Sequence, residues 1–308
     1  MIDPAVIVEA NPAWRGRSAR VSHWVPAIAS PMQRGVDHDG WRVEIGEERW
    51  FLKIPSPDQR RFIDAGAALD AARIAGQAGA APELLWSDAA SGAGAWPLLD
   101  AGWRTATLGD LSSSDVLHGV VAAKRRVHGG PLFGRTRDVF DLVARYADEA
   151  RAAGVALPED FAWMLANVTE MARAIAASGS DLAACHGDGI ASNVMLGPGG
   201  QVRLMDWDEA GNADPYWDLG SLFAEAFAFD PPARAALHAY AGRNDESLFA
   251  RCRLYGIADD VAWGTRSLIA AATTGRPDIE FFKYAQWRYL RARMSLHDRG
   301  FEAMLRTV

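Results

Sequence analysis

The segment from residue 186 to residue 208 constrains the fold of this chain more than any other part of its sequence. It reads HGDGIASN at 186–193, called the HGD loop below, and MDWD at 205–208, with VMLGPGGQVRL between them. Two apolar runs separated by glycine and proline predict an antiparallel hairpin directly after a polar loop. The chain must therefore bring the HGD loop and both ends of the hairpin into one place.

The hairpin can be registered from its own turn. With residues 197–200 as the loop, Val194 faces Met205. Asn193 then lies opposite Asp206. Directly opposed residues of an antiparallel pair have Cβ atoms roughly 5 Å apart. Both side chains carry hard oxygen donors, and Mg²⁺ usually takes only one or two such ligands from a protein. The register therefore predicts that Asn193 and Asp206 share a metal.

Three further acids and a histidine accompany this pair. Asp188 precedes Asn193 on the HGD loop, where it could orient an attacking hydroxyl and accept its proton, so it is the candidate base. Asp208 is the candidate secondary metal or water ligand. His186 is expected to orient the loop by hydrogen bonding, with proton transfer as the alternative role. Asp218 starts an apolar helix and is expected to cap it or to brace the loop.

The rest of the chain divides into a β-rich part and a helical part. WRVEI and RWFLKI around the turn-prone GEE predict a hairpin over residues 41–54. A serine, a proline and a glutamine at helix-start spacing predict a helix from Ser56 towards Gly79. APELLWSD and AWPLLDAG predict further strands, and helical periodicity dominates the remainder. The predicted fold is α+β with two lobes, residues 1–101 and 102–308.

Composition limits the environment and the partners. No apolar run approaches the ~20 residues of a membrane span, and the N-terminus lacks the pattern of a secretion signal. Two cysteines are too few for a disulfide framework, so a cytoplasmic location is expected. The net charge of −7 would repel a phosphate backbone, which disfavours nucleic acid and favours a small molecule, cationic in one interpretation. A monomer and a homodimer both remain open.

HGD, the hairpin, DWD and the following AGNADPYWDLG resemble the aminoglycoside phosphotransferase and choline/ethanolamine kinase superfamily over residues 182–229. The order of base and metal ligands follows that of protein kinases, but with HGD in place of HRD and no DFG. WG at 263–264 and YAQ at 284–286 are similar to the choline/ethanolamine kinase branch. The resemblance implies a bilobal protein-kinase-like fold, a small-molecule kinase activity, and ATP and Mg²⁺ as cofactors.

By this resemblance, Lys53 matches the lysine that contacts the α and β phosphates of the nucleotide. It is one of three lysines among 32 basic residues. Relatives usually place a glutamate in the following helix to pair with this lysine, whereas Gly66 and Ala68 occupy the matching positions here. Asp70 could replace that carboxylate from a turn later, or it could be a surface acid.

The resemblance also implies contacts on either side of this lysine. The preceding loop, ASPMQRGVDHDG, lacks the paired glycines common in the family, although Ser30, Gln33 and Arg34 could still reach phosphates. The adenine is expected against backbone groups of the hinge around Leu98 to Ala101, which includes Asp100.

The acceptor site is likewise implied by the resemblance. In the choline/ethanolamine kinase branch, a carboxylate matching Glu225 and aromatic rings including one matching Trp263 hold the ammonium of the substrate. Tyr284 belongs to the same aromatic group, although packing between helices is the alternative for any single ring. Arg266 stands where the branch often has a second tryptophan, and its guanidinium would repel a quaternary ammonium unless Glu225 neutralised it.

These features predict an enzyme that moves the γ-phosphoryl group of ATP to a hydroxyl of a small, choline- or ethanolamine-like amino-alcohol. A kinase for an aminoglycoside, homoserine or another hydroxylated metabolite is the alternative within the enzymes. A pseudokinase that serves as a binding module is the alternative outside them, because the glycine loop is altered and the helix glutamate is missing.

Overall fold

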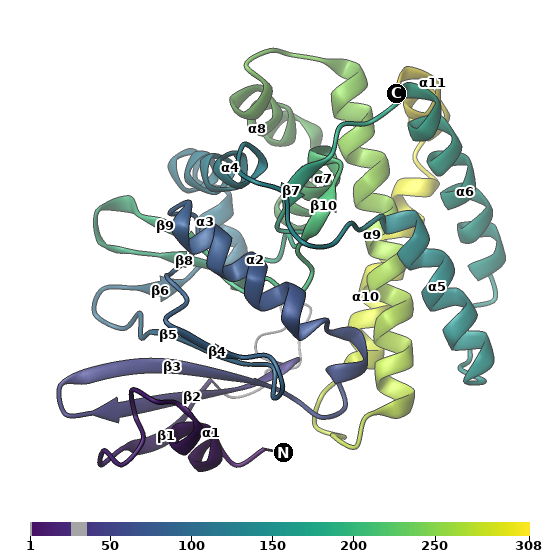
Figure 1. Ribbon diagram of the computed structural model, residues 1–308. Coiled ribbons are helices and arrows are strands. Elements are labelled where there is room, and N and C mark those ends of the chain that lie inside the picture. Colours follow the sequence, from purple (N-terminus) through teal and green to yellow (C-terminus); the bar gives the residue numbers. More distant parts are fainter. Residues whose placement is uncertain (1, 26–35) are drawn as a thin grey trace.

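A computed structural model describes residues 2–25 and 36–308 of the chain. Figure 1 shows a β-sheet at one end, formed by the N-terminal part, and a larger helical part above it. The sheet has five strands in the order β1-β2-β3-β5-β4, so the predicted α+β class is confirmed. Within the described ranges, no helix has the length and apolar character that crossing a membrane requires.

The sheet is antiparallel throughout and buries one face against the N-terminal helix α1 (Pro4–Ala10). β2 and β3 form the predicted hairpin, with Ile45 opposite Glu48. Gly46 in the turn has a φ of 63°, which glycine adopts without the strain that a side chain would add. Alternate residues such as Val43 and Leu52 fill the core beneath the sheet. The strands are β1 (Arg20–Val25), β2 (His38–Ile45), β3 (Glu48–Pro55), β4 (Trp86–Asp88) and β5 (Ala93–Pro97).

Helix α2 (Ala65–Gln77) begins later than the sequence predicted. Asp64 caps it, and the residues before Asp64 form turns and a short 3-10 helix. The predicted start at Ser56 was wrong because a neighbouring side chain, that of Asp58, contacts a distant part of the chain. Asp58 accepts a hydrogen bond of 2.9 Å from Arg276, which follows a distant helix. This tertiary contact overrides the local helix-start signal.

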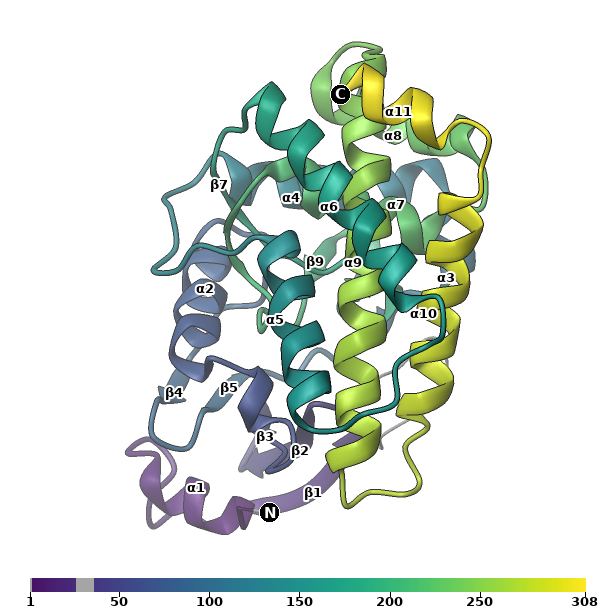
Figure 2. The same ribbon diagram turned by 90° about the vertical axis from the view of Figure 1, so that its right-hand side faces the viewer.

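The helical part is assembled around the long helix α9 (Glu246–Thr273), against which α5, α7, α10 and α11 pack. Figure 2 shows α9 running between α5 and α10. The helices at 139–152 and 161–178 confirm the helical structure that the periodicity of the sequence predicts for this part of the chain. The other helices are α3 (Leu108–Leu111), α4 (Ser114–His128), α5 (Val139–Ala152), α6 (Phe161–Ser178), α7 (Pro215–Ala226), α8 (Asp230–Ala241), α10 (Phe281–Leu296) and α11 (Phe301–Thr307).

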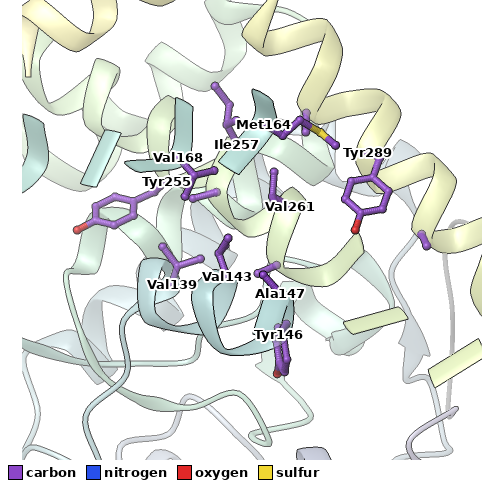
Figure 3. Packing of buried hydrophobic residues seen from close by; sticks show 14 of the residues in the cluster. Val139, Val143, Tyr146, Ala147, Met164, Val168, Tyr255, Ile257, Val261 and Tyr289 are labelled. Carbon is purple, nitrogen blue, oxygen red and sulfur yellow. The ribbon is translucent and has the colours of Figure 1, made fainter. Parts of the chain in front are cut away.

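Side chains from four helices meet in the core of this part (Figure 3). Val143 of α5, Met164 of α6, Val261 of α9 and Tyr289 of α10 are all fully buried. The hydroxyl of Tyr289 lies 2.9 Å from that of Thr265, so its polar end is also satisfied. The long helices are therefore held by apolar packing, and α9 presents its other residues to the site described below.

The hairpin forms, but its register differs from the prediction by one residue. β8 (Val194–Leu196) pairs with β9 (Val202–Leu204), so Val194 faces Leu204 and not Met205. The loop includes Gln201, whose carbonyl oxygen accepts a hydrogen bond from the N–H of Gly197. Consequently Asn193 lies opposite Met205, and the predicted pairing with Asp206 was wrong.

Short strands beyond the hairpin were not predicted. β6 (Arg104–Thr105) adds to the free edge of β8, and β7 (Ala183–Cys185) pairs with β10 (Gly211–Ala213). β7 leads directly into the HGD loop, and β10 follows closely after Asp208. The two strands therefore fix the entry to the loop beside the exit from the DWD segment.

Candidate active site

A cavity of about 610 Å³ is lined by β2, β3, β5, α2 and the hairpin β8–β9. Five of the predicted site residues line it: Lys53, Leu98, Asn193, Asp206 and Asp208. Its volume falls within the range of small-molecule sites. The fold therefore joins the predicted nucleotide side and the predicted metal side in one space.

Lys53 lies between the two acids of the DWD segment. Its Nζ is 2.6 Å from Asp206 Oδ1 and 3.5 Å from Asp208 Oδ1. Asp206 has a φ of 63°, in the left-handed region that aspartate tolerates better than most residues, so the chain turns sharply after β9. The acids that pair with Lys53 thus come from the hairpin and not from the helix after β3.

Burial and pairing move the pKa values of these groups in different directions. Burial alone would lower the pKa of Lys53, but the carboxylates of Asp206 and Asp208 raise it above its usual value. Burial opposes ionisation of Asp206 as well, yet the Lys53 ammonium holds its pKa below the usual range. Burial and the charge of Asp206 raise the pKa of Asp208 well above its usual value. A second cation would therefore be needed to ionise both acids fully.

Asp188, the candidate base, is buried at the start of the loop. Its Oδ1 accepts a hydrogen bond of 2.7 Å from the N–H of Ile190, and its Oδ2 accepts one of 2.8 Å from Asn193 Nδ2. Burial raises the pKa of the Asp188 carboxyl. The candidate base and one candidate metal ligand are therefore in direct contact.

His186 links the loop to the end of the hairpin. Its Nδ1 lies 3.0 Å from the carbonyl oxygen of Asp188, and its Nε2 lies 2.8 Å and 2.9 Å from the carbonyl oxygens of Met205 and Asp206. Both ring nitrogens therefore face backbone oxygens. This arrangement fits the orienting role and leaves no ring nitrogen directed at the cavity.

Sequence reasoning missed His38, which lies at the start of β2 and is buried. Its Nδ1 is 3.3 Å from Asp208 Oδ2, and its ligand atom lies within 4.8 Å of those of Asp206 and Asp208. Burial, followed by the charge of Lys53, lowers the pKa of His38 well below its usual value. No spacing signal could have identified it, because the sheet alone brings it to the DWD segment.

The donor set fits a divalent cation. Asp208 Oδ2 is buried, and although His38 Nδ1 lies 3.3 Å away, the geometry gives this oxygen no hydrogen bond from any residue that the structure describes. An unsatisfied buried carboxylate oxygen is costly, and a cation would satisfy it. Together with Asp206 and Asn193 it offers the hard oxygens that Mg²⁺ prefers.

One predicted pairing on the nucleotide side is contradicted, and one predicted hinge residue lies outside the cavity lining. Asp70 is a surface acid with a side chain 61% exposed, and it pairs with Arg73 on the same helix instead of with Lys53. The carboxylate of Asp100 pairs with Arg49 and does not line the cavity, whereas the neighbouring Leu98 does. Asp70 therefore pairs with a residue of its own helix, whereas Asp100 pairs with a residue of β3.

The contacts predicted for the loop before β2 fall on Ser30, Gln33 and Arg34. These three residues lie outside the described ranges.

The predicted aromatic cage is occupied by the arginines of the chain itself. The ring centroids of Trp263 and Tyr284 are 6.5 Å apart, so the two rings do meet. The guanidinium carbon of Arg266 lies 4.5 Å from the Trp263 centroid, and that of Arg288 lies 5.6 Å from it. Arg266 is held there by Asp37 at 3.1 Å. The aromatic faces are therefore already in cation–π contact.

Glu225 is buried at the end of α7 and only partly neutralised. Its Oε2 lies 3.2 Å from Arg291 Nη1. Its Oε1 is buried and has no hydrogen-bond partner among the described residues. The site thus has one carboxylate oxygen that is still able to accept a hydrogen bond.

Asp259 beneath this region yields a pH prediction. Burial raises its pKa to about 7, so between about pH 4 and pH 7 the folded state binds a proton that the unfolded state releases. Asp259 therefore makes the free energy of unfolding fall as pH rises through this window. We expect Asp259→Asn to remove that slope while keeping the acceptor for the Trp217 indole N–H, 3.0 Å away. Urea unfolding at pH 5, 6, 7 and 8 measures it, and parallel curves for both proteins would contradict it.

Comparisons with known proteins identify the family of this chain and structures that share its fold. The model of the phosphotransferase enzyme family (APH) matches residues 28–255. Among curated proteins, no significant match is found. A choline/ethanolamine kinase family protein from Mesorhizobium loti has a similar structure, with 24% identity, a TM-score of 0.81, and coverage of 99% of this chain and 97% of that one.

Two further solved structures share the fold. The choline kinase LicA from Streptococcus pneumoniae is 16% identical, with a TM-score of 0.76 and coverage of 95% of this chain and 98% of that one. A spectinomycin phosphotransferase in complex with ADP and spectinomycin is 13% identical, with a TM-score of 0.58 and coverage of 89% and 92%. The predicted kinase-like fold is thereby confirmed.

Proposed function

The chain belongs to the phosphotransferase enzyme family, and from this membership we propose that it transfers the γ-phosphoryl group of ATP to a hydroxyl of a small amino-alcohol. Asn193, Lys53, Asp206 and Asp208 line one cavity, and Asp188 contacts Asn193 directly; this arrangement carries the proposal. A base, a phosphate-binding cation and hard oxygen ligands are the parts that phosphoryl transfer needs.

Each residue has a defined role in this proposal. Asp188 accepts a hydrogen bond from the acceptor hydroxyl and takes its proton, and Asn193 fixes the orientation of that carboxylate. Lys53 leaves Asp206 to bind the phosphates. Asn193, Asp206 and Asp208 would hold Mg²⁺, which when bound neutralises charge on the phosphoryl group. The adenine would lie beside Leu98, and the ADP complex of the spectinomycin enzyme supports nucleotide use.

ATP turnover with a panel of acceptors tests the proposal. The panel contains ethanolamine, choline, homoserine and aminoglycosides, and ADP release is measured with and without Mg²⁺. Thermal unfolding with ATP is the companion measurement, because a ligand at 100 times its Kd adds about 2.7 kcal/mol of stability. A chain that hydrolyses or transfers nothing and shows no Mg²⁺-dependent shift with ATP would be a binding module and not a kinase.

The acceptor site favours a primary ammonium over a quaternary one. Arg266 and Arg288 cover the faces of Trp263 that a trimethylammonium would need. Glu225 Oε1 accepts no hydrogen bond from any described residue. A primary ammonium could donate one to it, whereas the quaternary ammonium of choline carries no N–H. A hydrogen bond to a charged group contributes about 1.5–3 kcal/mol.

We therefore expect kcat/KM to fall along the series ethanolamine, N-methylethanolamine, N,N-dimethylethanolamine and choline, by about 10–100-fold in total. Steady-state ADP release with each acceptor measures this. Glu225→Gln is the matched variant, since it keeps the shape of the side chain and should flatten the series. A wild-type enzyme that uses choline as well as ethanolamine would contradict the prediction.

A further inference from the structure

Lys124 is the most deeply buried lysine of the described chain, on the face of α4 that lies beneath the HGD loop. Its side chain is 1% exposed. The chain contains only three lysines among its 32 basic residues. A buried ammonium is costly unless its hydrogen bonds are satisfied, so the contacts of Lys124 need an explanation.

The ammonium makes two short contacts, one to a side chain and one to the backbone. Lys124 Nζ donates to Asp218 Oδ1 at 2.7 Å and to the carbonyl oxygen of Asp188 at 2.8 Å. Asp188 is the candidate base. Lys124 therefore binds the backbone of that residue directly, while the Asp188 carboxylate remains free for its bonds to Ile190 and Asn193.

Asp218 holds the preceding residues of the same loop. Its Oδ2 accepts from the N–H of His186 at 3.1 Å, and its Oδ1 accepts from the N–H of Gly187 at 2.9 Å. His128, one helical turn after Lys124, places its Nε2 2.9 Å from Asp218 Oδ2. The Asp218 carboxylate thus receives four donors, and α4 supplies two of them.

Gly187 shows how closely the loop is confined. It has a φ of 75°, and a Cβ there would lie 2.3 Å from the carbonyl oxygen of Glu209. The HGD loop therefore lies between Glu209, which follows the DWD segment, and the pair formed by Asp218 and Lys124. Shortening or removing a donor side chain on α4 would therefore shift the backbone of Asp188.

We propose that Lys124 is a positioning residue for phosphoryl transfer, which holds the carbonyl of Asp188 and the carboxylate of Asp218 at a fixed separation and so sets the place of the base. This inference rests on the proposed function. The rival interpretation is that Lys124 serves only as the counter-ion of buried Asp218. The two differ because a counter-ion needs no bond to the Asp188 carbonyl.

The first test is Lys124→Met, with Lys283→Met on the exposed face of α10 as the matched control. We expect kcat to fall by about 10–100-fold, because small displacements of a reacting group have effects of this size. KM for ATP should stay within about twofold, since Lys124 does not line the cavity. A folded Lys124→Met with wild-type kcat would overturn the proposal.

A measurement without substrate separates this inference from the proposed function. Hydrogen exchange of the His186 and Gly187 amides should accelerate in Lys124→Met and not in Lys283→Met, because Asp218 would lose its anchor. Unchanged protection of these amides would overturn the proposal. An acceptor panel with no turnover by the wild type would instead contradict the proposed function.

A double variant addresses the case in which Lys124→Met does not fold. Lys124→Met with Asp218→Asn removes both charges of the buried Lys124–Asp218 pair, so it is expected to fold better than Lys124→Met. If Lys124 were only a counter-ion, the double variant would recover kcat to the level of Asp218→Asn alone. The proposal requires that it stay at least about tenfold below that level, and full recovery would overturn it.

Discussion

Replacing Asp188 with asparagine is expected to lower kcat by about 10²–10⁴-fold, the range for loss of a general base. The variant keeps an acceptor for the N–H of Ile190 and a shape close to that of aspartate. It removes the group that takes the proton of the acceptor hydroxyl. The measurement is ADP release at saturating ATP and acceptor, with thermal unfolding to confirm that the variant is folded.

The pH profile sharpens this test. Because burial raises the pKa of Asp188, wild-type kcat/KM should fall on the acid side at a higher pH than an ordinary aspartate would give. Asp188→Asn should lose that acid limb along with its activity. Asp148→Asn, at a side chain 80% exposed on α5, is the matched control. Retention of the rate and of the acid limb in Asp188→Asn would exclude it as the base.

Asp206→Asn is expected to lower kcat/KM by about 10²–10³-fold, the usual effect of removing one preorganised electrostatic group. The variant removes the 2.6 Å ion pair with Lys53 and one carboxylate of the metal set. It should also raise the Mg²⁺ concentration needed for half-maximal turnover. Kinetics across a Mg²⁺ titration measure both effects.

The thermal stability of Asp206→Asn with ATP distinguishes the pairing of Asp206 with Lys53 from its proposed role as a metal ligand. Stabilisation by ATP alone should survive, because Lys53 is then free to bind phosphates. The additional stabilisation by Mg²⁺ should be lost. The exposed Asp148→Asn again serves as control. Wild-type Mg²⁺ dependence in Asp206→Asn would assign the metal to other residues.

Much of the site could be predicted because its parts are close in sequence. Asp188, Asn193 and Asp206 lie within one loop and one hairpin, and local turn chemistry brings them near each other. The register still came out one residue wrong, because nothing in the sequence of the turn reveals that Gln201 belongs to the loop.

Contacts between distant segments were beyond prediction. Asp70 was one candidate partner for Lys53, but it lies on an exposed face of α2 and pairs with Arg73. His38 and Lys124 carry no motif, and only the pairing of the sheet and the packing of α4 bring them to the site. The scarcity of lysine in the sequence drew attention to Lys53, and the same argument could have drawn attention to Lys124.

The ion pair between Lys53 and the acids of the hairpin has a consequence for ligand binding. The cation that would bind phosphate and the anions that would bind metal neutralise each other in the resting protein. A nucleotide alone would draw Lys53 away and leave the Asp206 carboxylate buried without its cation, and a metal alone would compete with the ammonium for that carboxylate. Each ligand would therefore remove the electrostatic cost of the other, so we expect their binding to be cooperative and, by linkage, reciprocal.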